Sequence, residues 1–211
     1  MVLGALLVFG GGAFGLKLAW DAGWFGLLPD WAKSAAAALC GGALLAAGEF
    51  VRRRLGGLAA AGLTAAGIGT LYATAWWSWV HLELYGAAAA FALLELTSGL
   101  AFVLALRGRS ALMGVLAVLL GNAVPLLFFE ESGPVFVAPV YLLCVFAAGL
   151  AMRRWSPRFA AVREAAWWGV AVVGGIWVLG NAFDPAAHWV GVVFVAGVWG
   201  LLLAEMTSTA Q

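Results

Sequence analysis

Residues 87–106 read AAAAFALLELTSGLAFVLAL, a continuous apolar stretch of 20 residues that contains one charged side chain, Glu95. A helix needs about 20 mostly apolar residues to cross about 30 Å of bilayer hydrocarbon. A barrel strand would instead alternate apolar and polar residues over about 10 positions. This stretch therefore predicts a transmembrane helix.

The same pattern recurs on both sides of this stretch along nearly the whole chain. Hydrophobic residues make up 65% of the sequence, charged residues 10%, and the mean hydropathy is +1.03. Soluble proteins carry about 25% charged residues. The sequence predicts an all-α integral membrane protein, a bundle of about eight transmembrane helices. The expected spans are Val2–Trp20, Ser34–Phe50, Leu55–Trp79, Ala87–Leu106, Ala111–Phe129, Val135–Met152, Ala165–Phe183 and Trp189–Glu205.

Spans of this length joined by short connections leave no room for a soluble domain. We expect a single polytopic membrane domain over residues 1–205 and a short polar tail over 206–211. The loop from Asp21 to Lys33 is rich in aromatic residues, and amphipathic rings prefer the headgroup level. We predict that it lies along the outer membrane surface, anchored by Trp24, Phe25 and Trp31.

The basic residues predict the orientation. Nine arginines lie in the connections after the second, fourth and sixth spans, whereas the opposite connections hold only Lys17 and Lys33. Because cytoplasmic loops carry the excess of basic residues, both termini are expected in the cytoplasm. In this apolar context arginines favour anionic lipid headgroups over nucleic acid. The expected headgroup contacts are Arg52, Arg53, Arg54, Arg107, Arg109, Arg153 and Arg154.

Glu95 is the main candidate functional residue. It lies eight residues into its span, so at about 1.5 Å per residue it is roughly 12 Å from the outer end. A carboxyl group at that depth is costly and normally faces the bundle interior. Ser98 shares its helix face, and Asn122 and Pro125 interrupt the next span. We interpret Glu95, Ser98, Asn122 and Pro125 as a candidate intramembrane polar site; a protonated Glu95 bonded to a neighbouring helix is the structural alternative.

Small residues at four-residue spacing predict close helix packing. Such stripes occur at Gly11 and Gly15, at Ala38, Gly42 and Ala46, and at Gly62, Ala66 and Thr70. Cys40 and Cys144 lie within apolar segments, so we expect buried thiols rather than a disulfide or a metal site. No nucleophile–base–acid set, phosphate loop or ligand spacing is visible in the sequence. We therefore expect no enzyme activity, no cofactor and no metal.

Several motifs resemble a bacterial family of predicted polytopic membrane proteins called domain of unknown function 2339. They are Gly4–Leu7 through Gly23–Trp24, Gly48-Glu49-Phe50 before Arg52–Arg54, Leu63–Gly67 with Leu71-Tyr72, and Leu104–Arg107 leading to Gly121–Pro125. Members are usually longer, with more spans, and Asn122 stands where the related pattern has glycine. The resemblance implies a multi-pass protein of the bacterial cytoplasmic (inner) membrane. It implies no particular activity.

Two classes of function follow from these features. The first, which we favour, is a structural or accessory subunit that packs against other membrane subunits or a second copy. It would do so through its Gly/Ala-rich faces and the outer Trp-rich loop Asp21–Lys33. The second is a small carrier or flippase-like transporter that uses the mid-membrane carboxylate of Glu95. A carrier usually places more polar groups near the midplane than this chain has.

Overall fold

The structure is a computed structural model that describes the chain except residues 1–25, 27, 55–56, 129–136, 182–184 and 210–211. The described residues form helices and contain no strand. The elements are α2 (Asp30–Arg54), α3 (Gly57–Val80), α4 (Ala87–Gly108), α5 (Ala111–Leu127), α6 (Val137–Trp155), the short 3₁₀ helix η2 (Pro157–Phe159), α7 (Ala160–Gly180) and α8 (Pro185–Thr209).

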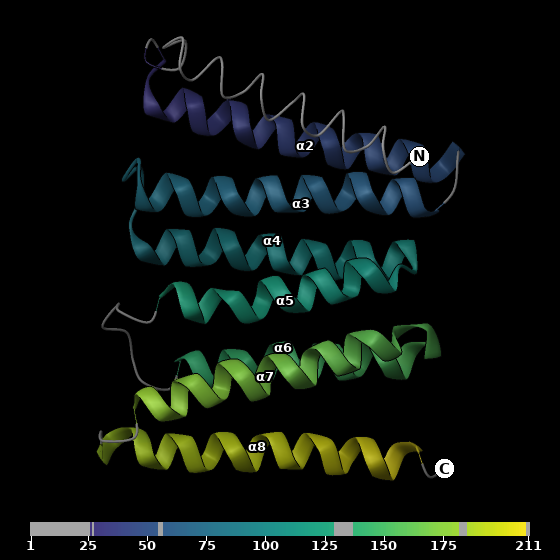
Figure 1. Ribbon diagram of the computed structural model, residues 1–211, viewed down its shortest axis with the longest axis vertical. Coiled ribbons are helices and arrows are strands. Elements are labelled where there is room, and N and C mark those ends of the chain that lie inside the picture. The colour runs from purple at the N-terminus through teal and green to yellow at the C-terminus, as the bar shows by residue number, and fades with distance from the viewer. Residues whose placement is uncertain (1–25, 27, 55–56, 129–136, 182–184, 210–211) are drawn as a thin grey trace.

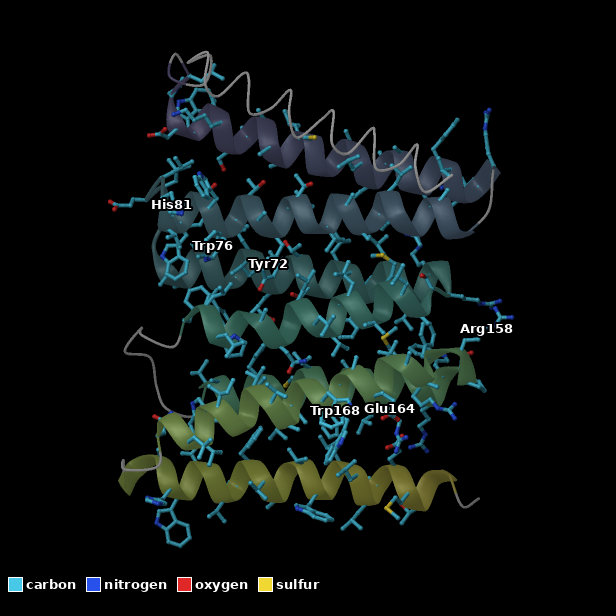
Figure 2. The ribbon with its side chains drawn as sticks, in the orientation of Figure 1. Tyr72, Trp76, His81, Arg158, Glu164 and Trp168 are labelled. Carbon is cyan, nitrogen blue, oxygen red and sulfur yellow. The ribbon has the colours of Figure 1, made fainter. Side chains whose placement is uncertain are left out.

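The helices lie side by side with their axes roughly aligned, in an elongated row (Figure 1). From one edge to the other the order is α2, α3, the pair α4 and α5, the pair α6 and α7, and α8. Successive helices run in opposite directions, so the C-terminal ends of α2, α4 and α6 lie at the same side of the row. We call this the arginine end, because Arg52–Arg54, Arg107, Arg109 and Arg153–Arg154 are there. Figure 2 shows Arg158 at this end and His81 at the opposite end.

The core lies in the middle of the row, where α5 packs against α4, α6 and α7. Val118, Phe146 and Val162 are fully or almost fully buried there. Glycines permit the close approach: a Cβ on Gly114 would lie 2.6 Å from Val162, and one on Gly149 would lie 2.5 Å from Ala166. Small residues bring membrane helices together in this way, since apolar burial gives no preference for protein over lipid.

Helices α2 and α3 pair through glycines as well. A Cβ on Gly48 would lie 2.5 Å from the Thr64 hydroxyl oxygen, and one on Gly67 would lie 2.9 Å from the Gly41 carbonyl oxygen. Gly62 and Ala66 of the expected packing stripe are exposed, so they do not join α3 to α2. Gly42 and Ala46 are exposed too. A four-residue spacing occurs on every face of a helix so rich in small residues, and only the register at Gly41, Gly48 and Gly67 is used. Gly11 and Gly15 lie outside the described residues.

Five of the described helical segments are long and apolar enough to cross a membrane: α2, α4, α6, α7 with η2, and α8. Helix α5 is apolar but shorter, at 17 residues. Several helices extend beyond their predicted bounds. Helix α2 begins at Asp30, so Asp30–Lys33 belong to the helix rather than to a surface loop, and an Asp30–Lys33 ion pair of 2.7 Å closes its first turn. Helix α8 continues to Thr209, through most of the expected tail.

The cysteines also differ from expectation. Both thiols are free, but Cys40 and Cys144 are exposed on the outer surfaces of α2 and α6 rather than buried. An apolar segment in a membrane does not imply burial within the protein, because the lipid-facing surface is apolar too. For the same reason large apolar side chains such as Leu96 and Leu119 are exposed.

Candidate functional site

Glu95 lies in the third turn of α4, and its side chain is only partly exposed. Its Oε1 atom is buried and has no hydrogen-bond partner among the described residues. The neighbouring Leu94 and Ser98 are buried, which shows that this side of α4 faces the other helices. The structure therefore places Glu95 at the edge of the helix row's interior.

Two tyrosines lie beside Glu95, one from α3 and one from α6. The Glu95 carboxyl group is within interaction range of both hydroxyls, as a hydrogen-bonding neighbour of Tyr141 and as a charged group near Tyr72. The Tyr141 oxygen is buried, and no partner in the described part of the chain meets the full distance and angle of a hydrogen bond with it. The Tyr141 ring packs edge-on against Phe91, one turn before Glu95 on α4, with 5.8 Å between ring centroids.

One turn of α5 contacts both tyrosines. The Tyr72 hydroxyl donates a hydrogen bond of 3.2 Å to the Leu120 carbonyl. The next residue is Gly121, and the Tyr141 oxygen lies only 3.3 Å from the place where a Cβ on Gly121 would be. Pro125 is four residues further on and has no N–H, so the Gly121 carbonyl loses its helical hydrogen bond. The Gly121 carbonyl, which receives no N–H from Pro125, thus belongs to the turn that both tyrosines touch.

Ser98 completes the group on α4. It lies three residues after Glu95, so the two side chains are neighbours on the helix surface. Ser98 is 3% exposed, and its hydroxyl oxygen has no hydrogen-bond partner within the described residues. We call Tyr72, Glu95, Ser98, Gly121 and Tyr141 the Glu95 cluster.

Asn122 faces a different neighbour. Its Nδ2 donates to the Val118 carbonyl at 2.8 Å, and its amide packs against Gly169 of α7, where a Cβ would lie 2.4 Å from Nδ2. Asn122 Oδ1 is buried and unpaired among the described residues. The contacts therefore associate Glu95 with α3 and α6, and Asn122 with α7. Pro125 is buried on α5, three residues after Asn122.

The two tyrosines were missed by sequence reasoning. Tyrosines are expected at the membrane boundaries, but Tyr72 lies eight residues before the end of α3 and Tyr141 lies four residues after the start of α6. A tyrosine hydroxyl that far inside a span was the feature of the sequence that could have pointed to these two residues. Pairing it with Glu95 requires the order of the helices in space, which spacing along one chain does not give.

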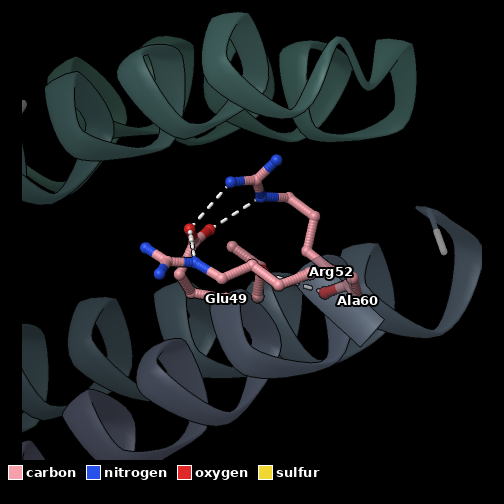
Figure 3. A network of polar contacts seen from close by, with 5 residues as sticks. Glu49, Arg52 and Ala60 are labelled. Atoms are coloured by element: carbon pink, nitrogen blue, oxygen red, sulfur yellow. Dashed lines mark hydrogen bonds and ion pairs between the residues drawn. The ribbon is translucent and has the colours of Figure 1, made fainter. Parts of the chain in front are cut away.

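Ion pairs order part of the arginine end. Glu49 accepts hydrogen bonds from Arg52 at 2.7 Å and from Arg53 at 3.0 Å, as Figure 3 shows. Arg163 joins α7 to α8 through Glu205 at 2.9 Å. Pairing within the protein leaves Arg52 and Arg53 less available for lipid phosphates than their number suggests. Headgroup binding by Arg54, Arg107, Arg109, Arg153 and Arg154 stays a prediction.

The remaining expectations concern the outer anchor and metals. Trp31 is exposed in the first turn of α2, whereas Trp24 and Phe25 lie outside the described residues. Within the described ranges no group of three or more His, Cys, Asp or Glu side chains could hold a metal ion.

Comparison with known proteins gives one match. A family described as "Predicted membrane protein (DUF2339)" matches residues 1–210. No curated protein and no solved structure matches the chain.

Proposed function

Because this chain belongs to the DUF2339 family of predicted membrane proteins, we propose that it is a non-enzymatic accessory subunit that assembles laterally with other membrane proteins. The observation that carries the proposal is the free face of α8, the last helix of the row (Figure 1). One face of α8 turns toward α6 and α7: Ala187 and Phe194 are buried, and Phe194 fills the space beside Gly174.

The opposite face of α8 has the spacing of a helix-pairing seam. Its residues are separated by alternating intervals of three and four, the period at which one helix face meets another. We call them the outer stripe: Trp189, Val192, Ala196, Trp199 and Leu203, all exposed. Trp189 is 76% exposed and Trp199 is 62% exposed. Small Ala196 lies between the large residues, with exposed Gly200 next to it, and small residues of this kind allow a second helix to approach closely.

Apolar grooves on both sides of α8 add to this face. One groove of ≈ 350 Å³ runs between α7 and α8 and is lined by residues such as Trp167, Leu179 and Trp199. A second groove of ≈ 240 Å³ lies between α6 and α8 beside Pro139 and Trp189. Side chains of a partner helix seated on the outer stripe would fill such grooves, which supports α8 as the assembly face.

We further propose that the eight spans expected from the sequence all cross the membrane, with the arginine end in the cytoplasm. The antiparallel order of the row supports this, because it collects Arg52–Arg54, Arg107 and Arg153–Arg154 at one end. In a background lacking Cys40 and Cys144, Glu83→Cys should react with an impermeant maleimide in intact cells, and Ser156→Cys only after lysis. Reaction of both variants, or of neither, before lysis would contradict the orientation.

The assembly itself is tested by mass. Protein extracted from native membranes in lipid nanodiscs, at its natural expression level, should run as a stoichiometric complex larger than the 21.9 kDa chain. A particle that holds a single copy and lipid alone would count against the subunit function.

A second function, a proton- or cation-linked carrier, is supported by the Glu95 cluster. Buried polar oxygens without partners are costly in a low-dielectric interior, and Glu95 Oε1, Ser98 Oγ and the Tyr141 hydroxyl are three such atoms in the described residues. Ionisable groups within membrane spans commonly mark ion or proton paths. Transport remains secondary here, because the cluster contains a single carboxylate.

A further inference from the structure

The Glu95 cluster has the composition of a cation site. Its polar atoms are all oxygens, contributed by a carboxylate, a serine hydroxyl, tyrosine hydroxyls and a backbone carbonyl from α3, α4, α5 and α6. Hard cations prefer oxygen ligands, and backbone carbonyls serve as well as carboxylates. In membrane transporters, carbonyls freed by an interruption of a helix coordinate Na⁺. Pro125 frees the Gly121 carbonyl in the same way.

The hydrogen-bond pattern points in the same direction. The Glu95 carboxyl and the Tyr141 hydroxyl lie close enough to influence each other, yet no partner in the described residues meets both the distance and the angle of a hydrogen bond for Glu95 Oε1 or for the Tyr141 oxygen. Oxygens around one cation, each about 2.4 Å from it, are held roughly 3.4 Å apart, beyond hydrogen-bond length. Ser98 supplies a third unpaired oxygen, and this residue is only 3% exposed.

Charge selects the class of cation. The cluster holds one carboxylate, and Tyr72 and Ser98 are neutral. A monovalent ion would neutralise Glu95, whereas a divalent ion would leave a net positive charge in a region of low dielectric constant, where an uncompensated charge is costly. We propose that Glu95, Ser98, Tyr141 and the Gly121 carbonyl bind one monovalent alkali cation. This inference uses the same cluster as the carrier function but requires no transport.

The test uses the whole purified protein in detergent, with its tryptophans as the unfolding probe. A ligand that binds only the folded state raises the melting temperature. The wild type should melt about 3 °C or more higher in Li⁺, Na⁺ or K⁺ chloride than in choline chloride at equal ionic strength. Glu95→Gln should abolish the difference and Tyr141→Phe should reduce it. Glu83→Gln, in the exposed turn after α3, is the matched control and should keep it.

A second measurement needs no variant. Dicyclohexylcarbodiimide reacts with a protonated carboxyl group in an apolar environment, so mass spectrometry should find Glu95 modified in choline chloride. The stabilising cation should lower that modification severalfold. Melting temperatures equal in all salts, or a cation effect that survives Glu95→Gln, would overturn the proposal. So would modification that no alkali cation reduces, which would indicate a protonated carboxyl or a bound water. If alkali cations raise the melting temperature but are not transported, the carrier function would be contradicted and the cation site would stand.

Discussion

Gly48→Val is expected to prevent α2 from packing on α3. It should lower the amount of folded protein more than the other substitutions do. The nearest atoms to an added Cβ are the Thr64 hydroxyl oxygen at 2.5 Å and the Thr64 backbone nitrogen at 3.0 Å. The Ala60 carbonyl oxygen follows at 3.3 Å. Two of these three belong to backbone, which cannot move aside as a flexible side chain can. Overpacking costs about 1–3 kcal/mol in soluble cores and exceeds that where backbones must separate.

Gly62→Val is the matched control on the partner helix. Gly62 is exposed on α3, and no atom of the described residues lies within 4 Å of its added Cβ. The readout is the fraction of protein that stays monodisperse in detergent, together with the melting temperature. Gly48→Val should lower both strongly, and Gly62→Val should stay close to the wild type. Equal behaviour of the two variants would show that α2 and α3 do not pack in this register.

Glu95→Lys is the second change with a large expected effect. The Lys ammonium would lie among tyrosine oxygens, and the Glu95 cluster would no longer contain a carboxylate to pair with it. A cation at such depth costs at least about 2.5 kcal/mol. The four-carbon side chain would also meet the Tyr141 hydroxyl, which already abuts Gly121. We therefore expect poor insertion or strong destabilisation, measured by yield from membranes and by melting temperature.

Glu95→Gln separates charge from volume at the same position. The amide has a similar size and keeps a hydrogen-bonding group, so the fold should persist. A carrier would lose coupling with this variant, whereas an assembly subunit would keep its partners. If Glu95→Lys inserted and assembled like the wild type, Glu95 would have to face water or the headgroups, and the Glu95 cluster could not exist as described.

The sequence predicted the class of fold and most helix positions because each span carries its own signal. Residues 87–106, for example, need no neighbour to indicate a membrane helix, and α4 covers Ala87–Gly108. Helix ends were less predictable. Asp30 and Lys33 look like loop residues by polarity, but their ion pair and the favourable place of Asp at a helix start extend α2 through them.

The site was predicted only in part, for a physical reason. Glu95 and Ser98 share one helix, so their proximity follows from helical periodicity. Tyr72, Tyr141 and Gly121 come from three other helices, and their approach depends on which faces of those helices meet. Glycine and alanine occur on many faces here, as exposed Gly62 and buried Gly48 illustrate. The pattern of small residues therefore does not select the packing face, and Asn122 turns toward Gly169 instead of toward Glu95.

Photocrosslinking from the outer stripe tests the assembly function most directly. In the background lacking Cys40 and Cys144, a benzophenone maleimide attached at Ala196→Cys would probe the middle of the free face of α8. Leu201→Cys, at a position partly buried against the core, is the inward-facing control. After irradiation of native membranes, Ala196→Cys should give a discrete product containing a second membrane protein or a second copy of the chain, and Leu201→Cys should not. Crosslinks from Ala196→Cys to lipid alone would contradict a role as a laterally assembling subunit.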